Sequence, residues 1–69
     1  MAIVRVELGR RSQEQRDAII KGITEVLVAN GAKSEGTQVI LYEVDMQVWG
    51  KGGKTFAKRA EEQGIKLPH

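Results

Sequence analysis

Residues 39–44 read Val-Ile-Leu-Tyr-Glu-Val, a nearly continuous run of apolar and β-branched side chains. Such a short run fits a β-strand better than a helix. An apolar run without alternation also indicates a strand that is buried on both faces. We therefore predict a central strand from Val39 to Val44, and the rest of the chain is interpreted around it.

A second strand is predicted at the start of the chain, from Ile3 to Leu8. Apolar residues alternate there with Arg5 and Glu7, which places Val4, Val6 and Leu8 together on one face. Strict alternation is typical of a strand with one buried face and one exposed face.

Between these strands, the spacing predicts an amphipathic helix from Gln13 to Ala29. Ser12 and Gln15 have the spacing of a capping box at its start. Asn30 and Gly31 end it, because glycine readily takes the left-handed conformation that follows a helix. The apolar side of this helix is expected to carry Ile19, Ile20, Ile23, Val26 and Leu27, with Asn30.

Strand, helix and strand form a βαβ unit, in which the two strands are parallel and the crossover is right-handed. The polar segment from Ala32 to Gly36 is expected to be a short loop. One helix covers one face of a two-stranded sheet and leaves the other face bare and apolar. The sequence therefore predicts an α+β subunit that must oligomerise.

After Val44, glycines at positions 50, 52 and 53 predict a tight turn or small hairpin. A further helix is expected from Lys54 to Gln63, docked by Phe56, Ala57 and Ala60 and ended by Gly64. Leu67–His69 should be frayed. We interpret residues 1–69 as one domain with a core over 2–53 and a C-terminal tail over 54–69.

Composition excludes several classes of function. The chain has no cysteine and one histidine, His69, so neither a thiolate metal site nor a cysteine or serine triad can form. No stretch is long and apolar enough for a membrane span, and the alternating first residues do not suit a signal peptide. We predict no metal, no membrane association and a cytoplasmic location. The segment Gly50–Thr55 lacks the spaced first glycine of a phosphate-binding loop.

Three segments occur in an order that resembles the 4-oxalocrotonate tautomerase family. They are Gly9–Arg16 at the start of the helix, Tyr42–Val44 at the end of the second strand, and Trp49–Gly53 in the glycine turn. The resemblance extends from Ala2 to Gly53. It implies a homohexamer built as a trimer of dimers, or a related trimeric assembly.

The same resemblance implies a cofactor-free isomerase for a small anionic carboxylate substrate. Members of the family move a proton between carbons of a 2-hydroxydienoate or another enolisable carboxylate. Their base is the amine of an N-terminal proline, and arginines bind the substrate. In this chain the proline position falls on Ala2, which is either a natural variant or an engineered replacement.

The family's substrate-binding residues fall on four further positions. The family's arginine before the helix corresponds to Arg11. Arg10 is an alternative, because the spacing from the first strand to the arginine is one residue shorter here than expected for the family. The second arginine corresponds to Gln38, which carries no charge. The aromatic position corresponds to Trp49, as a pocket wall or an interface anchor. Leu8 is expected in the pocket floor or the core.

Two other residues have reactive side chains near these positions. Glu43 and Tyr42 could exchange protons, although a carboxylate at a strand end is more often a surface or interface partner. We interpret both as structural.

Three functions remain as hypotheses. The first is an isomerase that uses the N-terminal amine. The second is a non-catalytic subunit, for example in a heteromer in which another chain provides the base. The third is a nucleic-acid binder, which rests only on a net charge of +2 and one tryptophan; we predict that nucleic acid is not a partner.

Overall fold

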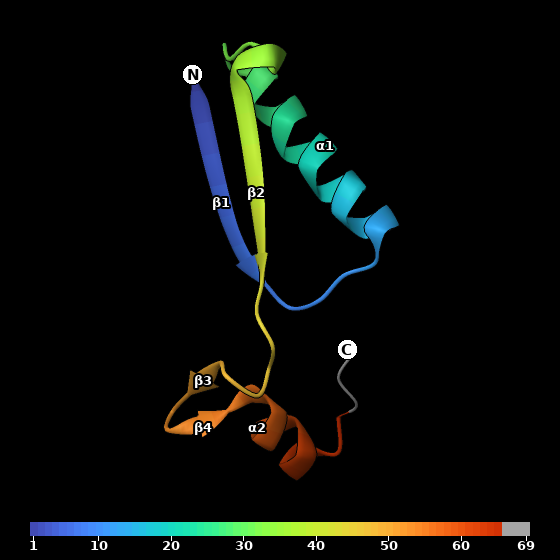
Figure 1. The fold of residues 1–69 in the computed structure, drawn as a ribbon, viewed down its shortest axis with the longest axis vertical. Coiled ribbons are helices and arrows are strands. Elements are labelled where there is room, and N and C mark those ends of the chain that lie inside the picture. Colours follow the sequence, from blue (N-terminus) through green and yellow to red (C-terminus); the bar gives the residue numbers. More distant parts are fainter. Residues whose placement is uncertain (66–69) are drawn as a thin grey trace.

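A computed structural model describes residues 1–65 of the chain. The elements, in chain order, are β1 (Ala2–Leu8), α1 (Gln13–Ala29), the 3₁₀ helix η1 (Ser34–Gly36), β2 (Thr37–Glu43), β3 (Gly50–Lys51), β4 (Lys54–Thr55) and α2 (Phe56–Gln63). They form two parts, a βαβ unit and a smaller C-terminal unit that extends from the end of β2 (Figure 1). The expected frayed segment Leu67–His69 lies outside the described residues.

The two long strands pair in parallel, which confirms the βαβ prediction. Ala2 lies opposite Thr37, and Leu8 lies opposite Glu43. β2 begins two residues earlier than predicted, because Thr37 and Gln38 complete the pairing with the start of β1 despite their polar side chains. At the other end, β2 stops at Glu43, one residue before the predicted end at Val44. The Val44 N–H nevertheless donates to the Leu8 carbonyl at 2.9 Å.

The bounds of α1 are those predicted. The Ser12 hydroxyl accepts from the Gln15 N–H at 3.1 Å, and the Gln15 side chain accepts from the Ser12 N–H at 3.0 Å. This reciprocal capping box satisfies two main-chain donors at the helix start. Asn30 is the C-cap, and Gly31 has φ of +107°. The loop expected over Ala32–Gly36 contains η1, closed by the Gly36 N–H donating to the Lys33 carbonyl.

α1 packs along β2 and covers one face of the sheet (Figure 1). The apolar stripe of the helix is wider than this narrow sheet. Val26, which was placed on the apolar side of the helix, is consequently 63% exposed in the single chain. Ile19, Ile23 and Leu27 are half-buried.

The opposite face of the sheet is open. Ile3, Ile40 and Tyr42 are 45%, 36% and 46% exposed there, so the predicted burial of the second strand on both faces is not achieved within one chain. Ala60 is the single buried apolar residue among those described. The accessible surface of 5404 Å² exceeds the about 4300 Å² expected for a compact monomer of this mass.

The C-terminal unit contains the expected hairpin and helix. β3 and β4 pair antiparallel through a turn at Gly52 and Gly53, which both have positive φ. α2 begins two residues later than predicted, because Lys54 and Thr55 belong to the hairpin. Gly64 ends it with φ of +71°.

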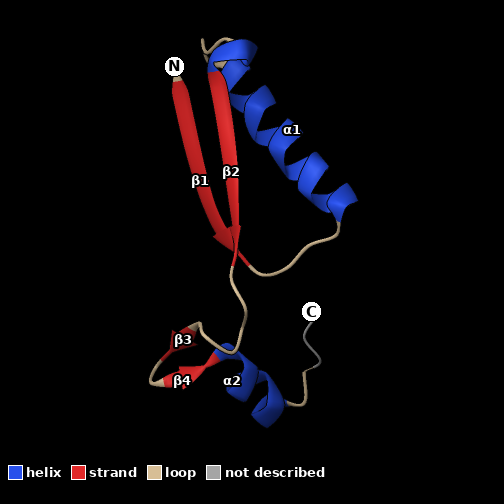
Figure 2. Ribbon diagram, viewed as in Figure 1, coloured by secondary structure: helices blue, strands red, loops and turns tan. Residues whose placement is uncertain are grey.

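This C-terminal unit lies apart from the helix–sheet layer (Figure 2). The radius of gyration is consequently 15.3 Å, whereas a compact chain of this length would have about 11 Å. Neither helix of the described residues is long and apolar enough to cross a membrane.

We expect Ile40→Lys to weaken self-association, because it replaces an apolar side chain of the open face with a second cation beside Arg5, the register partner of Ile40. Burial of an isoleucine side chain contributes about 1.5–3 kcal/mol, which the variant would lose in each subunit. Sedimentation velocity should show a smaller species, and the urea midpoint should fall. Ala18→Lys, at an exposed position of α1, is the control. Equal assembly of both variants would show that the open face is not an interface.

Candidate functional site

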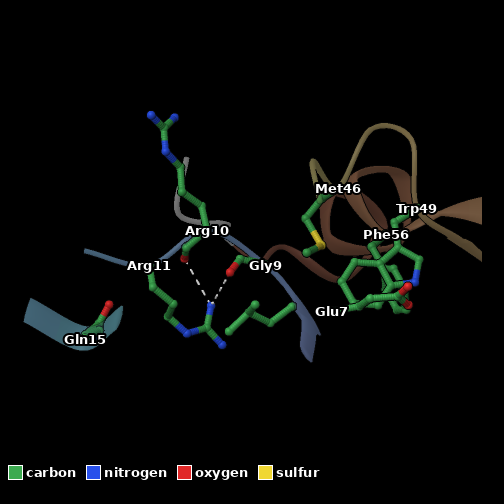
Figure 3. Close-up of a pocket in the computed structure, with 9 residues that line it drawn as sticks. Glu7, Gly9, Arg10, Arg11, Gln15, Met46, Trp49 and Phe56 are labelled. Atoms are coloured by element: carbon green, nitrogen blue, oxygen red, sulfur yellow. Dashed lines mark hydrogen bonds between the residues drawn. The ribbon is translucent and has the colours of Figure 1, made fainter. Parts of the chain in front are cut away.

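A pocket of about 730 Å³ opens where β1 ends and α1 begins (Figure 3). It is formed by the end of β1, the loop that leads into α1, and the C-terminal unit. Its lining residues are Glu7, Leu8, Gly9, Arg10, Arg11, Gln15, Met46, Trp49 and Phe56. Four of the residues predicted from the sequence therefore surround one space: Leu8, Arg10, Arg11 and Trp49.

Hydrogen bonds to Glu43 hold the loop between β1 and α1, which carries Arg10 and Arg11, in place. One of its carboxylate oxygens accepts from the Arg16 Nε at 2.6 Å and from the Arg11 main-chain N–H at 3.1 Å. The other oxygen accepts from an Arg16 terminal nitrogen at 2.6 Å. The end of β2, the loop and the first turn of α1 are thereby joined by one carboxylate. This two-point contact is the geometry in which an arginine binds a carboxylate most strongly.

The charge state of Glu43 follows from these contacts. The hydrogen bonds from Arg16, assisted by the Arg11 N–H, hold the pKa of the Glu43 carboxyl below its ordinary value, although partial burial opposes this. The same contact raises the pKa of Arg16. Glu43 is therefore ionised at neutral pH, and both of its carboxylate oxygens accept hydrogen bonds. This agrees with the structural role inferred from the sequence. Tyr42, the other proton-exchange candidate, projects onto the open face.

Arg10 and Arg11 are held differently. The Arg11 Nη1 donates to the carbonyls of Gly9 and Arg10 at 3.1 and 3.0 Å, so its guanidinium folds back along the loop (Figure 3). Its other nitrogens make no protein hydrogen bond among the described residues and can still donate to a ligand. Arg10 is exposed, and Figure 3 draws it turned away from Met46 and Trp49.

An apolar wall lies across the pocket from this loop. The rings of Trp49 and Phe56 meet edge to face, with centroids 5.4 Å apart. The Phe56 N–H donates to the Trp49 carbonyl at 2.8 Å. Met46 packs against the loop, because a Cβ on Gly9 would lie 2.8 Å from its terminal methyl carbon. Trp49 is therefore half-buried in the wall of a pocket.

Ala2 and Gln38 are far from this pocket within one chain. Ala2 starts β1, and a strand of this length spans about 20 Å between Ala2 and Leu8. Ala2 lines a separate hollow with Met1, Ala32 and Lys33, among others. Gln38 lies opposite Ile3 on the exposed face of the sheet. One chain therefore does not bring the predicted base and the predicted arginines together.

The sequence did not single out Glu7, Gln15, Met46 or Phe56 as pocket residues. The position of Glu7 at the end of β1 was a usable signal, since the carboxyl ends of parallel strands often carry sites. Met46 and Phe56 gave no such signal, because their place in the lining depends on how the segment after β2 is positioned relative to the loop before α1.

Comparison with known proteins places the chain in a family. The family model described as "Tautomerase enzyme" matches residues 3–59. The chain is 30% identical over 60 residues to "Probable tautomerase K2" of Dickeya dadantii (strain 3937), covering 86% of this chain and 90% of that protein. The chain belongs to the tautomerase family, as its resemblance to 4-oxalocrotonate tautomerases implied.

Solved structures agree with this assignment. The structure of TomN, a 4-oxalocrotonate tautomerase homologue in the tomaymycin biosynthetic pathway, is similar with a TM-score of 0.80 and 28% identity, covering 86% of this chain and 94% of that one. A heterohexamer 4-oxalocrotonate tautomerase from Chloroflexus aurantiacus J-10-fl has the same fold, with a TM-score of 0.70 and 22% identity over 84% and 95% of the two chains.

We expect Glu43→Gln to destabilise the protein at neutral pH by removing the charge that binds Arg16. Because the pKa of Glu43 is lowered in the folded state, its stabilisation is present above the unfolded carboxyl pKa of about 4.3 and is lost as the pH falls through the folded value. The difference in urea midpoint between wild type and variant should therefore shrink as the solution becomes acidic.

The control is Glu62→Gln, which removes the exposed ion pair with Lys54. It should change the midpoint less, since solvent screens exposed pairs. A constant difference between wild type and Glu43→Gln from pH 7 to pH 2 would contradict the assignment.

Proposed function

We propose that the chain is a cofactor-free tautomerase of a small enolisable 2-hydroxydienoate or 2-oxo carboxylate. The observation that carries the proposal is the pocket itself, which combines arginine donors at a helix start with an aromatic wall. The arginines would bind the substrate carboxylate and stabilise the negative charge that develops on the enolate oxygen. Trp49 would exclude water from the reacting carbons.

The N-terminal amine of Ala2, released by removal of Met1, would be the general base. An α-amino group has an unperturbed pKa of about 7.7–8.0. An apolar pocket and nearby arginines would both disfavour its protonated form and lower its pKa further. A base whose pKa is near the working pH is the most efficient one. If Met1 were retained, the free amine would belong to Met1, one residue before the position of the base.

The active site of this proposal is shared between subunits. Ala2 starts the same strand that ends at the pocket, so the amine of one subunit would have to meet the arginines and Trp49 of another. We propose a homohexamer, arranged as a trimer of dimers, as the assembly that achieves this. The exposed apolar residues of the open face, Ile3, Ile40 and Tyr42, support association of this kind.

A non-catalytic subunit is the second candidate. Ala2 in place of proline and Gln38 in place of the second arginine both favour it. In that case a sister chain would bring the base, in an assembly comparable to the heterohexamer relative. Co-purification of a chain with an N-terminal proline would support this candidate, and a fully active homo-oligomer would contradict it.

We expect Ala2→Pro to raise kcat/KM by about 10²-fold or more, the lower range of what a well-placed general base contributes. The proline ring holds its nitrogen in one orientation, whereas the primary amine of alanine rotates. The assay follows loss of the enol absorbance of 2-hydroxymuconate and of phenylenolpyruvate. Mass spectrometry must report loss of Met1 in both proteins.

The comparison separates the two candidates. If both proteins form the same oligomer and both lack activity on both substrates, the isomerase proposal is wrong and the subunit candidate replaces it. A large gain for Ala2→Pro would show that the pocket is competent and that the base limits the rate.

We expect Arg11→Lys to raise KM about tenfold, because lysine keeps the charge but loses the planar set of donors. A tenfold change is about 1.4 kcal/mol, close to the lower end of the roughly 1.5–3 kcal/mol that one charge-assisted hydrogen bond contributes. Arg10→Lys is the control and should change KM less, since Arg10 is exposed and turned away from the wall. The opposite order of effects would assign substrate binding to Arg10.

A further inference from the structure

The open face of the sheet carries two opposite charges among its apolar side chains. Along β1, Arg5 and Glu7 follow Ile3 on this face, since alternate residues of a strand project to the same side. Ile40 and Tyr42 of β2 are the register partners of Arg5 and Glu7. All five residues are exposed in the single chain. A surface that covers this face must therefore accommodate one cation and one anion as well as apolar side chains.

Neither of these charges has an ion-pair partner within residues 1–65. The ion pairs of that part of the chain join Arg16 to Glu43, Lys21 to Glu25 and Lys54 to Glu62. Removing an unpaired charge from water is costly, and leaving one member of a pair without its partner is strongly destabilising. A partner that covers the open face must therefore bring an anion to Arg5 and a cation to Glu7.

β1 also has a free edge. In its sheet it pairs with β2 alone, and Figure 2 shows β2 along one side of β1 only. The strand contains no proline, and the main-chain groups of such an edge pair readily with a strand of another molecule. A second copy of the chain brings an identical strand. When two identical strands meet antiparallel around a two-fold axis, residue i faces residue j and residue j faces residue i.

The charges of β1 distinguish between the registers of such a pair. A ladder centred on Val6 places Arg5 opposite the partner's Glu7 on both sides of the axis, and opposite charges across a strand pair are favourable. A ladder centred on Arg5 or on Glu7 places that residue opposite its own copy, which is unfavourable. A shift by one residue would set the open face of one copy beside the helix-covered face of the other.

The ladder centred on Arg5 would be the longer one, because it pairs residues 2–8 of both strands rather than residues 4–8. It would also set the two arginines against each other and each Glu7 against the partner's Ile3. All of these charges would then lack an opposite charge on a face that is to be covered. The charges therefore favour the ladder centred on Val6 over the longer one.

We propose that Arg5 of each subunit pairs with the partner's Glu7, and that these two ion pairs fix the register in which a second copy adds to the free edge of β1, centred on Val6. The charges of the open face are then neutralised in pairs, and the apolar residues beside them become available for further burial. The proposal concerns assembly, and it holds whether or not the chain is an isomerase.

Charge reversal tests the ion pairs. Arg5→Glu and Glu7→Arg each place like charges opposite one another on both sides of the axis. Each should raise the dissociation constant of the assembly at least tenfold, measured by sedimentation velocity at low ionic strength, where charges are screened least. The double variant, Arg5→Glu with Glu7→Arg, restores opposite charges in reversed order and should return the constant to within threefold of wild type.

The matched control is Lys21→Glu, which makes the same change of net charge as Arg5→Glu at an exposed position of α1. It should assemble as wild type does. The two single variants are also mixed, since one carries glutamate at both positions and the other arginine at both. Native mass spectrometry should then show a mixed assembly. Single variants that assemble like wild type, a double variant that stays dissociated, or the absence of a mixed assembly would each overturn the proposal.

Cysteine crosslinking tests the register. The chain has no cysteine, so Val6→Cys introduces a single thiol, which faces its own copy in the proposed ladder. Residues directly opposite in antiparallel strands have Cα atoms about 4.5–5.5 Å apart, within the range of a disulfide. Mild oxidation should give a covalent dimer on a non-reducing gel. Val4→Cys, on the same face of β1, is the control: its copy would lie opposite Leu8, roughly 13 Å away along the strand, and should not crosslink.

The competing register gives a different pattern. In a ladder centred on Arg5, Val4 would face the partner's Val6, so Val4→Cys and Val6→Cys would crosslink with each other in a mixture and neither would crosslink alone. That pattern would overturn the proposal, as would a wild-type chain that stays monomeric at every concentration. A covalent dimer of Val6→Cys alone, without one of Val4→Cys, would support it.

Discussion

A two-stranded sheet with one helix has only one covered face, and this constraint governs the rest of the molecule. α1 shields the side of the sheet that carries Val4, Val6 and Leu41, whereas Ile3, Ile40 and Tyr42 stay exposed. Apolar surface in water is unfavourable in proportion to its area. We therefore propose that other subunits cover that face. The separate C-terminal unit also exposes apolar surface, since Val48 is 77% exposed.

The parallel direction of the strands determines where chemistry is possible. Their carboxyl ends lie together, and Glu43 joins the end of β2 to the loop and to the first turn of α1. This contact holds the loop that carries Arg10 and Arg11 against the end of β2. The amino ends of the strands, with Ala2 and Gln38, lie at the opposite edge. The same topology that builds the arginine side of a site therefore separates it from the N-terminal amine of its own chain.

The two departures from the family pattern have different physical meanings. If Ala2 occupies the position of the catalytic proline, as we propose, its amine after removal of Met1 would lack the rigid ring that holds the nitrogen of a proline. Gln38, which we propose at the position of the second arginine, carries no charge, and Arg10 and Arg11 are the cations that line the pocket within one chain.

Local signals in the sequence determined the elements of this protein. Alternation in β1, the Ser12–Gln15 capping box, the bounds of α1 and the glycine hairpin all depend on residues close together in the chain, and all were predictable. Family membership was predictable for the same reason. Tertiary structure alone decided that Arg16 binds Glu43, that Met46 and Phe56 line a pocket, and that Val26 stays exposed. These contacts join residues far apart in the sequence, and their geometry depends on how whole elements pack, which no local pattern encodes.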